Sequence, residues 1–158
     1  MNFRPFAIIG GLVICGQASI AHAAACGVDA QPLAFGSFNT LDSQPHDTTA
    51  DISVTCQATG AETVNYDISL STGGAGSYSE RTLLSGAEVL DYNIYKDGSR
   101  SIVWGDGSSF TETISDSMTF TGAGQEINNH TAYGRVLGNQ QTAMIGSYVD
   151  TITITMTY

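Results

Sequence analysis

Basic residues, proline, histidine and cysteine are all scarce in this chain, and each shortage narrows its possible functions. The 158 residues include 5 Lys and Arg against 15 Asp and Glu, so the net charge is −10. A surface this acidic repels nucleic acid and anionic membranes, which argues against a nucleic-acid partner. The 3 histidines and 3 cysteines do not fall in a metal-ligand spacing, so we expect no metal and no cofactor.

Long hydrophobic runs are also lacking, with one exception near the N-terminus. Residues 6–16 form an apolar stretch that follows Arg4 and precedes Ala21-His22-Ala23, which has small residues at the −3 and −1 positions of a cleavage site. We therefore predict a signal peptide over residues 1–23 and a mature domain over residues 24–158. The stretch is shorter than the roughly 20 residues of a membrane span, although a membrane anchor is the alternative. No integral membrane segment is expected after cleavage.

The cysteine count changes once the signal is removed. Cys15 leaves with the signal, so Cys26 and Cys56 remain as an even pair in an oxidising compartment. A disulfide is the default interpretation of such a pair. Lipidation of Cys26 is an alternative, but Ala23 stands where a lipoprotein signal has Leu, and lipidation would leave Cys56 without a partner.

No window of the mature chain has a convincing helical period. The best helical candidate, residues 80–91, is interrupted by Gly86. Apolar residues instead alternate with polar ones, and turn-forming residues separate the runs, which predicts an all-β sandwich or barrel. The strands are expected at residues 33–38, 51–58, 62–71, 89–96, 101–104, 116–121, 131–137 and 148–158.

The last predicted strand is the most informative. Ile152, Ile154, Met156 and Tyr158 alternate with four threonines up to the final residue, which places one row on a core and the other in water. A long strand with no successor favours an intermolecular partner, because an exposed edge recruits other strands. Pairing within the same chain is the alternative, since many strands end a chain in this way.

Catalytic motifs are missing. His46 and His130, the two histidines of the mature chain, are interpreted as surface residues, and no Gly-x-Ser-x-Gly elbow occurs. A Ser-His-Asp site is a spatial arrangement, so it stays open at this stage. We expect no enzyme; a secreted lectin or carbohydrate-active enzyme would need a polar or metal constellation for which there is no motif.

Several blocks of sequence are similar to those of a known family. Residues 90–97 (LDYNIYKD), 103–107 (VWGDG), 133–136 (YGRV) and 146–154 (GSYVDTITI) resemble the signature of the spore coat protein U domain, as do Cys26, Phe35-Gly36 and residues 54–56. The resemblance covers nearly all of the mature chain. Its C-terminal Gly-Ser-Tyr-x-Asp-Thr block is the most specific part.

The resemblance implies a fold and a mode of assembly. It implies an incomplete immunoglobulin-like β-sandwich that lacks its last strand and is completed by donor-strand complementation. The implied partners are a periplasmic pilus chaperone, an outer-membrane usher and other pilin subunits, and the implied destination is the cell surface by way of the periplasm. The chaperone and donor-strand groove would involve Ile152, Ile154, Met156 and Tyr158. A non-fibrous spore or cell-envelope coat protein with the same fold is the alternative.

One departure suggests a role within a pilus. Only Ala24 and Ala25 separate the predicted cleavage site from Cys26, whereas a donated extension needs about 10 residues. We therefore expect a tip subunit that accepts a strand without donating one. Trp104, Met144 and Ile145 are then candidates for adhesive loops, although core packing is the simpler interpretation of Trp104.

Overall fold

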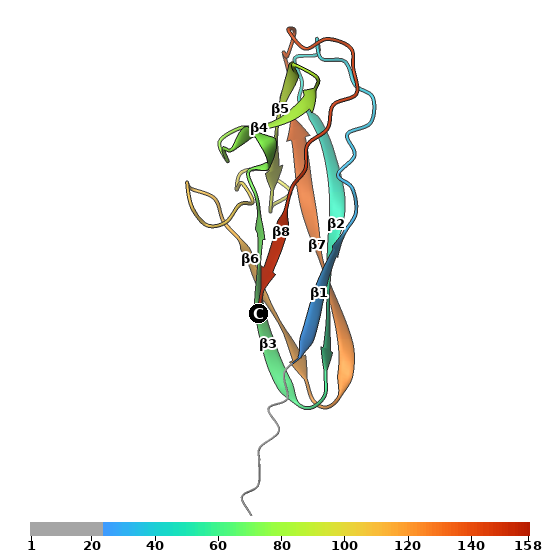
Figure 1. The fold of residues 1–158 in the computed structure, drawn as a ribbon, viewed down its shortest axis with the longest axis vertical. Helices are drawn as coiled ribbons and strands as arrows, with labels where there is room; N and C mark the ends of the chain where they lie inside the picture. The colour runs from blue at the N-terminus through green and yellow to red at the C-terminus, as the bar shows by residue number, and fades with distance from the viewer. Residues whose placement is uncertain (1–23) are drawn as a thin grey trace, which may run out of the picture.

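Two antiparallel sheets pack face to face in the computed structural model, which describes residues 24–158. The predicted signal peptide lies outside the described residues. The five-stranded sheet has the order β1-β2-β7-β5-β4 and the three-stranded sheet the order β6-β3-β8 (Figure 1). The elements are β1 (Ala25–Ala30), β2 (His46–Ala58), β3 (Glu62–Leu70), η1 (Gly73–Ala75), β4 (Arg81–Ser85), β5 (Glu88–Tyr95), β6 (Ile114–Phe120), β7 (Gly124–Val136) and β8 (Ile154–Thr157).

The core lies between the two sheets and follows the predicted alternation. In β2 the buried residues are Ile52, Val54, Cys56 and Ala58, while the residues between them are more exposed. Strands β3 and β5 alternate in the same way. Burying one large aliphatic side chain contributes about 1.5–3 kcal/mol, so this row of contacts is the main source of stability. The expected all-β fold is confirmed.

Two elements of the five-stranded sheet differ from the expectation. The segment that offered the best helical pattern forms a β-hairpin of β4 and β5, because Gly86 adopts a φ of 64° at the turn between them. Strand β7 begins at Gly124, although its first residues are polar and exposed. It pairs with β2 along its whole length, so the ladder extends β7 where the side chains give no alternating pattern.

The first and last segments depart further from the predicted strands. Residues 33–38 are extended but join no ladder, and Gly36 interrupts them with a φ of 70°. The first strand is instead β1, a short strand in which only Cys26 and Val28 pack against the core. At the other end only residues 154–157 of the predicted strand 148–158 form a ladder, as β8 on β3.

Candidate strand-acceptor groove

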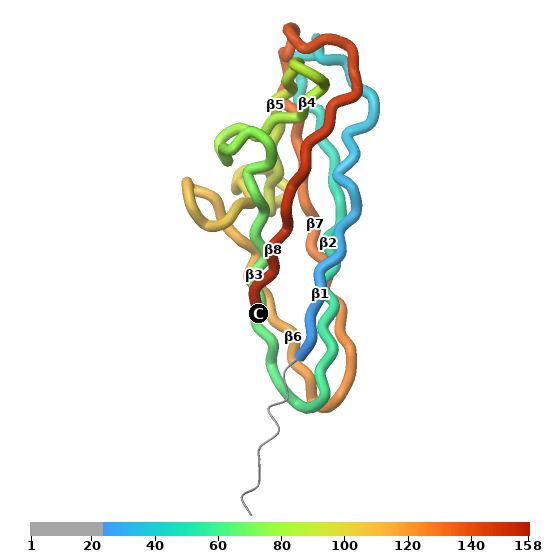
Figure 2. Tube along the Cα trace, viewed as in Figure 1, coloured from blue at the N-terminus to red at the C-terminus, as the bar shows by residue number. Residues whose placement is uncertain are grey.

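An apolar groove of about 960 Å³ runs between the first and last segments of the described chain. Residues 30–40 line one wall and residues 144–150, Ile152 and Ile154 line the other, and Figure 2 shows these two segments running alongside each other. The inner face of the five-stranded sheet forms the floor, with side chains that include Ile52, Leu83, Leu90, Tyr92, Ile94 and Ala132.

The groove lies between the segments that adjoin two sheet edges. Among residues 24–158, strand β1 ends the five-stranded sheet and pairs with β2 alone, while β8 ends the three-stranded sheet and pairs with β3 alone. Ala30 of β1 and Ile154 of β8 line the groove, and its walls are otherwise the chain that follows β1 and the chain that precedes β8. Among residues 24–158, no strand joins these two edges (Figure 1). An edge strand has unpaired main-chain N–H and C=O groups, so the geometry leaves space and hydrogen-bonding partners for one more strand.

The predicted groove residues divide into two groups. Ile152, Ile154 and Met156 are half-buried against the core, and the threonines between them are exposed. Ile152 and Ile154 line the groove itself, whereas Met156 and Tyr158 do not. Tyr158 is 59% exposed, so the alternation that holds through Met156 does not extend to the last residue.

Asp150 fixes residues 144–154, called here the last segment, above the floor of the groove. Its carboxylate accepts hydrogen bonds from the Tyr92 hydroxyl at 2.7 Å and from the Gly74 amide at 2.9 Å. Burial and the bond to Asp150 raise the pKa of Tyr92 far above its ordinary value, so the phenol remains a donor. A Cβ at Gly73 would lie 2.1 Å from this carboxylate, which explains the glycine there. The Gly-Ser-Tyr-x-Asp-Thr block contains Asp150 but does not by itself indicate this contact.

Backbone hydrogen bonds hold the same segment at both ends. Val149 and Leu84 exchange two main-chain bonds of 2.8 and 3.0 Å, and the Ser71 amide donates to the Thr153 carbonyl at 2.9 Å. The last segment therefore crosses from the β4 edge of one sheet to the β3 edge of the other before β8 begins. This path places Ile152 and Ile154 along one wall of the groove.

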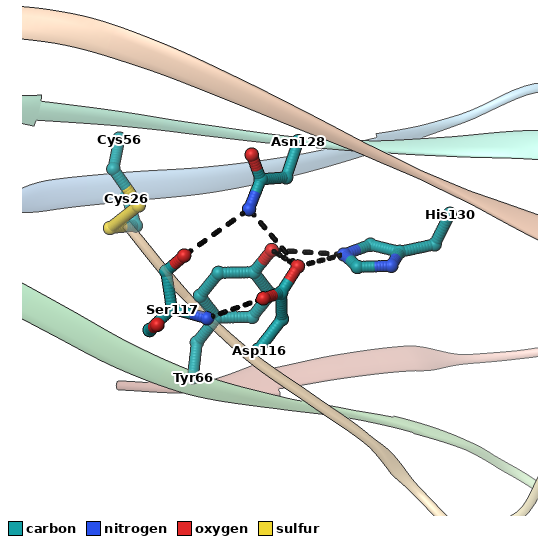
Figure 3. Close-up of a disulfide and its surroundings, with 7 residues drawn as sticks. All are labelled: Cys26, Cys56, Tyr66, Asp116, Ser117, Asn128 and His130. Carbon is teal, nitrogen blue, oxygen red and sulfur yellow. Dashed lines mark hydrogen bonds and ion pairs between the residues drawn. A yellow bond between two sulfur atoms is a disulfide. The ribbon is translucent and has the colours of Figure 1, made fainter. Parts of the chain in front are cut away.

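The predicted disulfide between Cys26 and Cys56 is present and joins β1 to β2. The two cysteines are direct partners in the ladder between these neighbouring strands of one sheet, and Figure 3 shows the bond that joins them. Closing a loop of 30 residues stabilises a fold by about 3–4 kcal/mol in the chain-entropy estimate. Because β1 is an edge strand, the disulfide fixes the edge of the five-stranded sheet that borders the groove.

The sequence predicted that His46 and His130 are surface residues, but in the structure both are half-buried. His46 begins β2 and bonds the carbonyl of Phe35 in the groove wall. His130 on β7 lies in a polar cluster between the sheets (Figure 3). Its Nε2 is 2.9 Å from the Tyr66 hydroxyl, which is 3.3 Å from the carboxylate of Asp116. Burial lowers the pKa of His130, and Asp116 opposes this shift only in part.

The three candidate adhesive residues have different surroundings. Trp104 is completely buried, and its Nε1 donates to the Ile68 carbonyl at 2.9 Å, so its proposed adhesive role is wrong. Met144 and Ile145 are 63% and 106% exposed at the end of the groove. Leu41, 63% exposed, was not identified from the sequence, and its loop is joined to theirs by the bond from the Asn139 amide to the Asp42 carbonyl.

Residues 24–158 contain no group of three or more His, Cys, Asp or Glu side chains placed to hold a metal ion. They also contain no helix that is long and apolar enough to cross a membrane.

The fold is therefore an immunoglobulin-like β-sandwich with an open groove between two edge strands. The chain belongs to the spore coat protein U domain family, whose model matches residues 14–155. A comparison with the curated proteins found no match.

One solved structure with a similar fold is the pre-assembly complex of CsuC and CsuE, a chaperone and a tip adhesion subunit from archaic chaperone–usher Csu pili of Acinetobacter baumannii. The match has a TM-score of 0.55 and 21% sequence identity. It covers 86% of this chain and 40% of that chain, so this chain spans less than half the length of its match. The likeness is one of fold.

Proposed function

We propose that this protein is an exported structural subunit of a chaperone–usher pilus, assembled by accepting a β-strand from a partner. The observation that carries the proposal is the apolar groove between residues 30–40, which continue the β1 edge, and residues 144–154, which lead into β8. A donated strand would form main-chain hydrogen bonds with these edges, and its alternate apolar side chains would fill the groove. Family membership and the Csu pilus structure support the same function.

The successive partners follow from the need to cover this groove. Apolar surface on this scale is costly to leave in water and invites aggregation. A periplasmic chaperone would occupy the groove first, and at the outer-membrane usher the extension of another pilin subunit would replace it. The protein would reach the cell surface by this route. No covalent bond is made or broken in the exchange, so the function requires no cofactor.

We place the protein at the tip of the pilus. Strand β1 begins at Ala25 and Ala24 packs against the core, so cleavage after Ala23 would leave the first mature residues within the fold. Such a subunit accepts a strand without having one to donate. The exposed apolar side chains of Leu41, Met144 and Ile145 at one end of the sandwich are then available for contact with a surface.

Two adjacent residues of β8 test the acceptor function. Ile154 is half-buried and lines the groove, whereas Thr155 is exposed on the opposite face. We expect Ile154→Asp to reduce the complex with its periplasmic pilus chaperone about tenfold or more, because a carboxylate would be buried without a partner. Thr155→Asp adds the same charge and should leave the complex intact.

Co-expression in the periplasm followed by quantitative co-purification measures both complexes. Formation of the Cys26–Cys56 disulfide reports whether the Ile154→Asp chain has folded. Deletion of Tyr158, which lies outside the groove, provides a second variant and probes whether the chaperone also holds the end of the chain. A full yield of complex with Ile154→Asp would contradict the proposal.

A further inference from the structure

The wall formed by residues 32–38, called here the strap, is attached to the sandwich in an unusual way. The Gln31 amide donates to the Asp51 carbonyl at 3.0 Å, and beyond it the strap makes no main-chain hydrogen bond to the rest of residues 24–158. The opposite wall differs, since its main chain is bonded at Val149, at Thr153 and along β8. The strap is therefore the wall that main-chain bonds do not fix.

Two side chains of β2 replace the missing ladder. The Thr48 hydroxyl donates to the Ala34 carbonyl at 2.9 Å, and Nε2 of His46 donates to the Phe35 carbonyl at 2.7 Å. The ring of Phe38 stacks on His46 at a centroid distance of 5.0 Å. Residues 46 and 48 are less exposed than their neighbours in β2, so both side chains point towards the inner face of the sheet.

A glycine on the inner face of the five-stranded sheet lets the strap pack closely against the sheet. Gly134 of β7 pairs with Thr48 on one side and with Ile94 on the other. A Cβ at this position would lie 2.7 Å from Leu33 and 2.9 Å from Phe35. The glycine thus allows both side chains to lie against the sheet, and the edge of the Phe35 ring meets Tyr92 at 5.9 Å.

We infer that Thr48 and His46 are positioning residues for strand acceptance, because they hold the strap as a preformed wall of the groove. The inference rests on the proposed function. The two tethers bond the Ala34 and Phe35 carbonyls, so other main-chain groups of the strap remain free for an incoming strand. A wall that is already placed spares the donor the conformational entropy of ordering it, and preorganisation of this kind raises affinity.

Thr48 allows a closely matched test. Thr48→Val keeps the shape and β-branching of the side chain but loses the hydroxyl, whereas Thr48→Ser keeps the hydroxyl. The probe is a synthetic peptide of about ten residues with Val and Ile alternating with Ser and Thr, long enough to span the groove. We expect Thr48→Val to bind it about three- to tenfold more weakly, since one hydrogen bond is lost, and Thr48→Ser to bind like the wild type.

Backbone order parameters from NMR and thermal unfolding distinguish positioning from general stability. In the free Thr48→Val protein, the order parameters of residues 33–38 should fall below those of the wild type, while those of β3 should be unchanged. His46→Phe, which keeps an aromatic ring facing Phe38 but has no donor, should act in the same direction. Thr48→Val with a lowered melting temperature but wild-type peptide affinity would overturn the positioning role and leave the proposed function standing. A wild-type protein that does not bind the peptide would overturn both.

Discussion

At the scale of single residues, the polar cluster of Tyr66, Asp116 and His130 lies between the sheets and links three strands by hydrogen bonds. Without it, apolar contacts in the core would hold these strands together. Tyr66 comes from β3, Asp116 from β6 and His130 from β7. The side-chain amide of Asn128 also donates to the Asp116 carboxylate at 3.0 Å, so this carboxylate has a further partner besides Tyr66. Since β6 and β7 belong to different sheets, these bonds fix the sheets against each other.

The cluster predicts how stability depends on pH. Burial lowers the pKa of His130, so the unfolded chain binds a proton more readily than the folded chain. The contribution to stability is therefore complete above the unfolded pKa of about 6.5 and is lost as pH falls towards the lower folded value. We expect the free energy of unfolding in urea to fall more steeply over this range for the wild type than for His130→Gln. Equal pH slopes for the two proteins would contradict this account.

Arg81 shows what residue-level prediction from composition misses. It is one of few cations in an acidic chain, yet it is completely buried. Its guanidinium donates to the carbonyls of Ser71 and Trp104 at 2.8 Å each and to the Asn93 side chain at 2.7 Å. Those acceptors are brought together only by the tertiary fold, so neither charge nor periodicity could identify the site. Trp104, whose carbonyl accepts one of these bonds, is also completely buried, and its burial likewise depends on contacts that only the folded chain makes.

At the scale of elements, the alternation of apolar and polar residues predicted the strands that face the core. It failed where a ladder, a disulfide or side-chain hydrogen bonds determine the path of the chain. Strands β3 and β5 were placed to within one residue, and β2 over residues 51–58, because one face of each is buried there; residues 46–50 of β2 were missed. Strand β1 is held by a ladder and a disulfide, neither of which requires alternating side chains. The strap has the alternation of a strand, but its positive-φ Gly36 and its side-chain tethers exclude it from the sheet.

The loop that carries Met144 and Ile145 yields a prediction about attachment. Replacing both residues by Asp should lower attachment to an apolar surface about tenfold or more, because each buried apolar side chain contributes about 1.5–3 kcal/mol. Both residues also line one end of the groove, so secretion of the variant is measured first and attachment is compared at equal amounts of purified protein. Binding of the purified protein to polystyrene measures the effect. The matched control is Thr142→Asp, which adds charge to the same loop without removing apolar area. Unchanged attachment of the double variant would refute the adhesive role.

At the scale of the whole molecule, charge and groove define two different kinds of surface. Lys96 pairs with Glu112, and Arg100 and Arg135 both pair with Asp47. With Arg81 buried, the other acidic residues leave the surface strongly negative, which favours solubility. The groove is mainly apolar, and it is the part of the described surface that we propose for a partner strand.

The groove itself could be anticipated only in part. The alternating final segment correctly predicted an apolar row, and the family resemblance predicted that this row borders an acceptor site. The opposite wall could not be predicted, because it depends on contacts of Thr48, Gly134 and Phe35 that are far apart in sequence. Asp150 lay within a recognised block, but its bonds to Tyr92 and Gly74 appear only when the chain is folded.

Strand acceptance is the central claim, and amide hydrogen exchange with and without the alternating peptide tests it most directly. The account predicts new protection in residues 33–38 and 150–154, which border the groove on its two sides. Strand β6 forms the opposite edge of the three-stranded sheet and has no residue in the groove lining, so it serves as an internal control whose exchange should not change. Protection confined to β6, or no protection anywhere, would contradict the account.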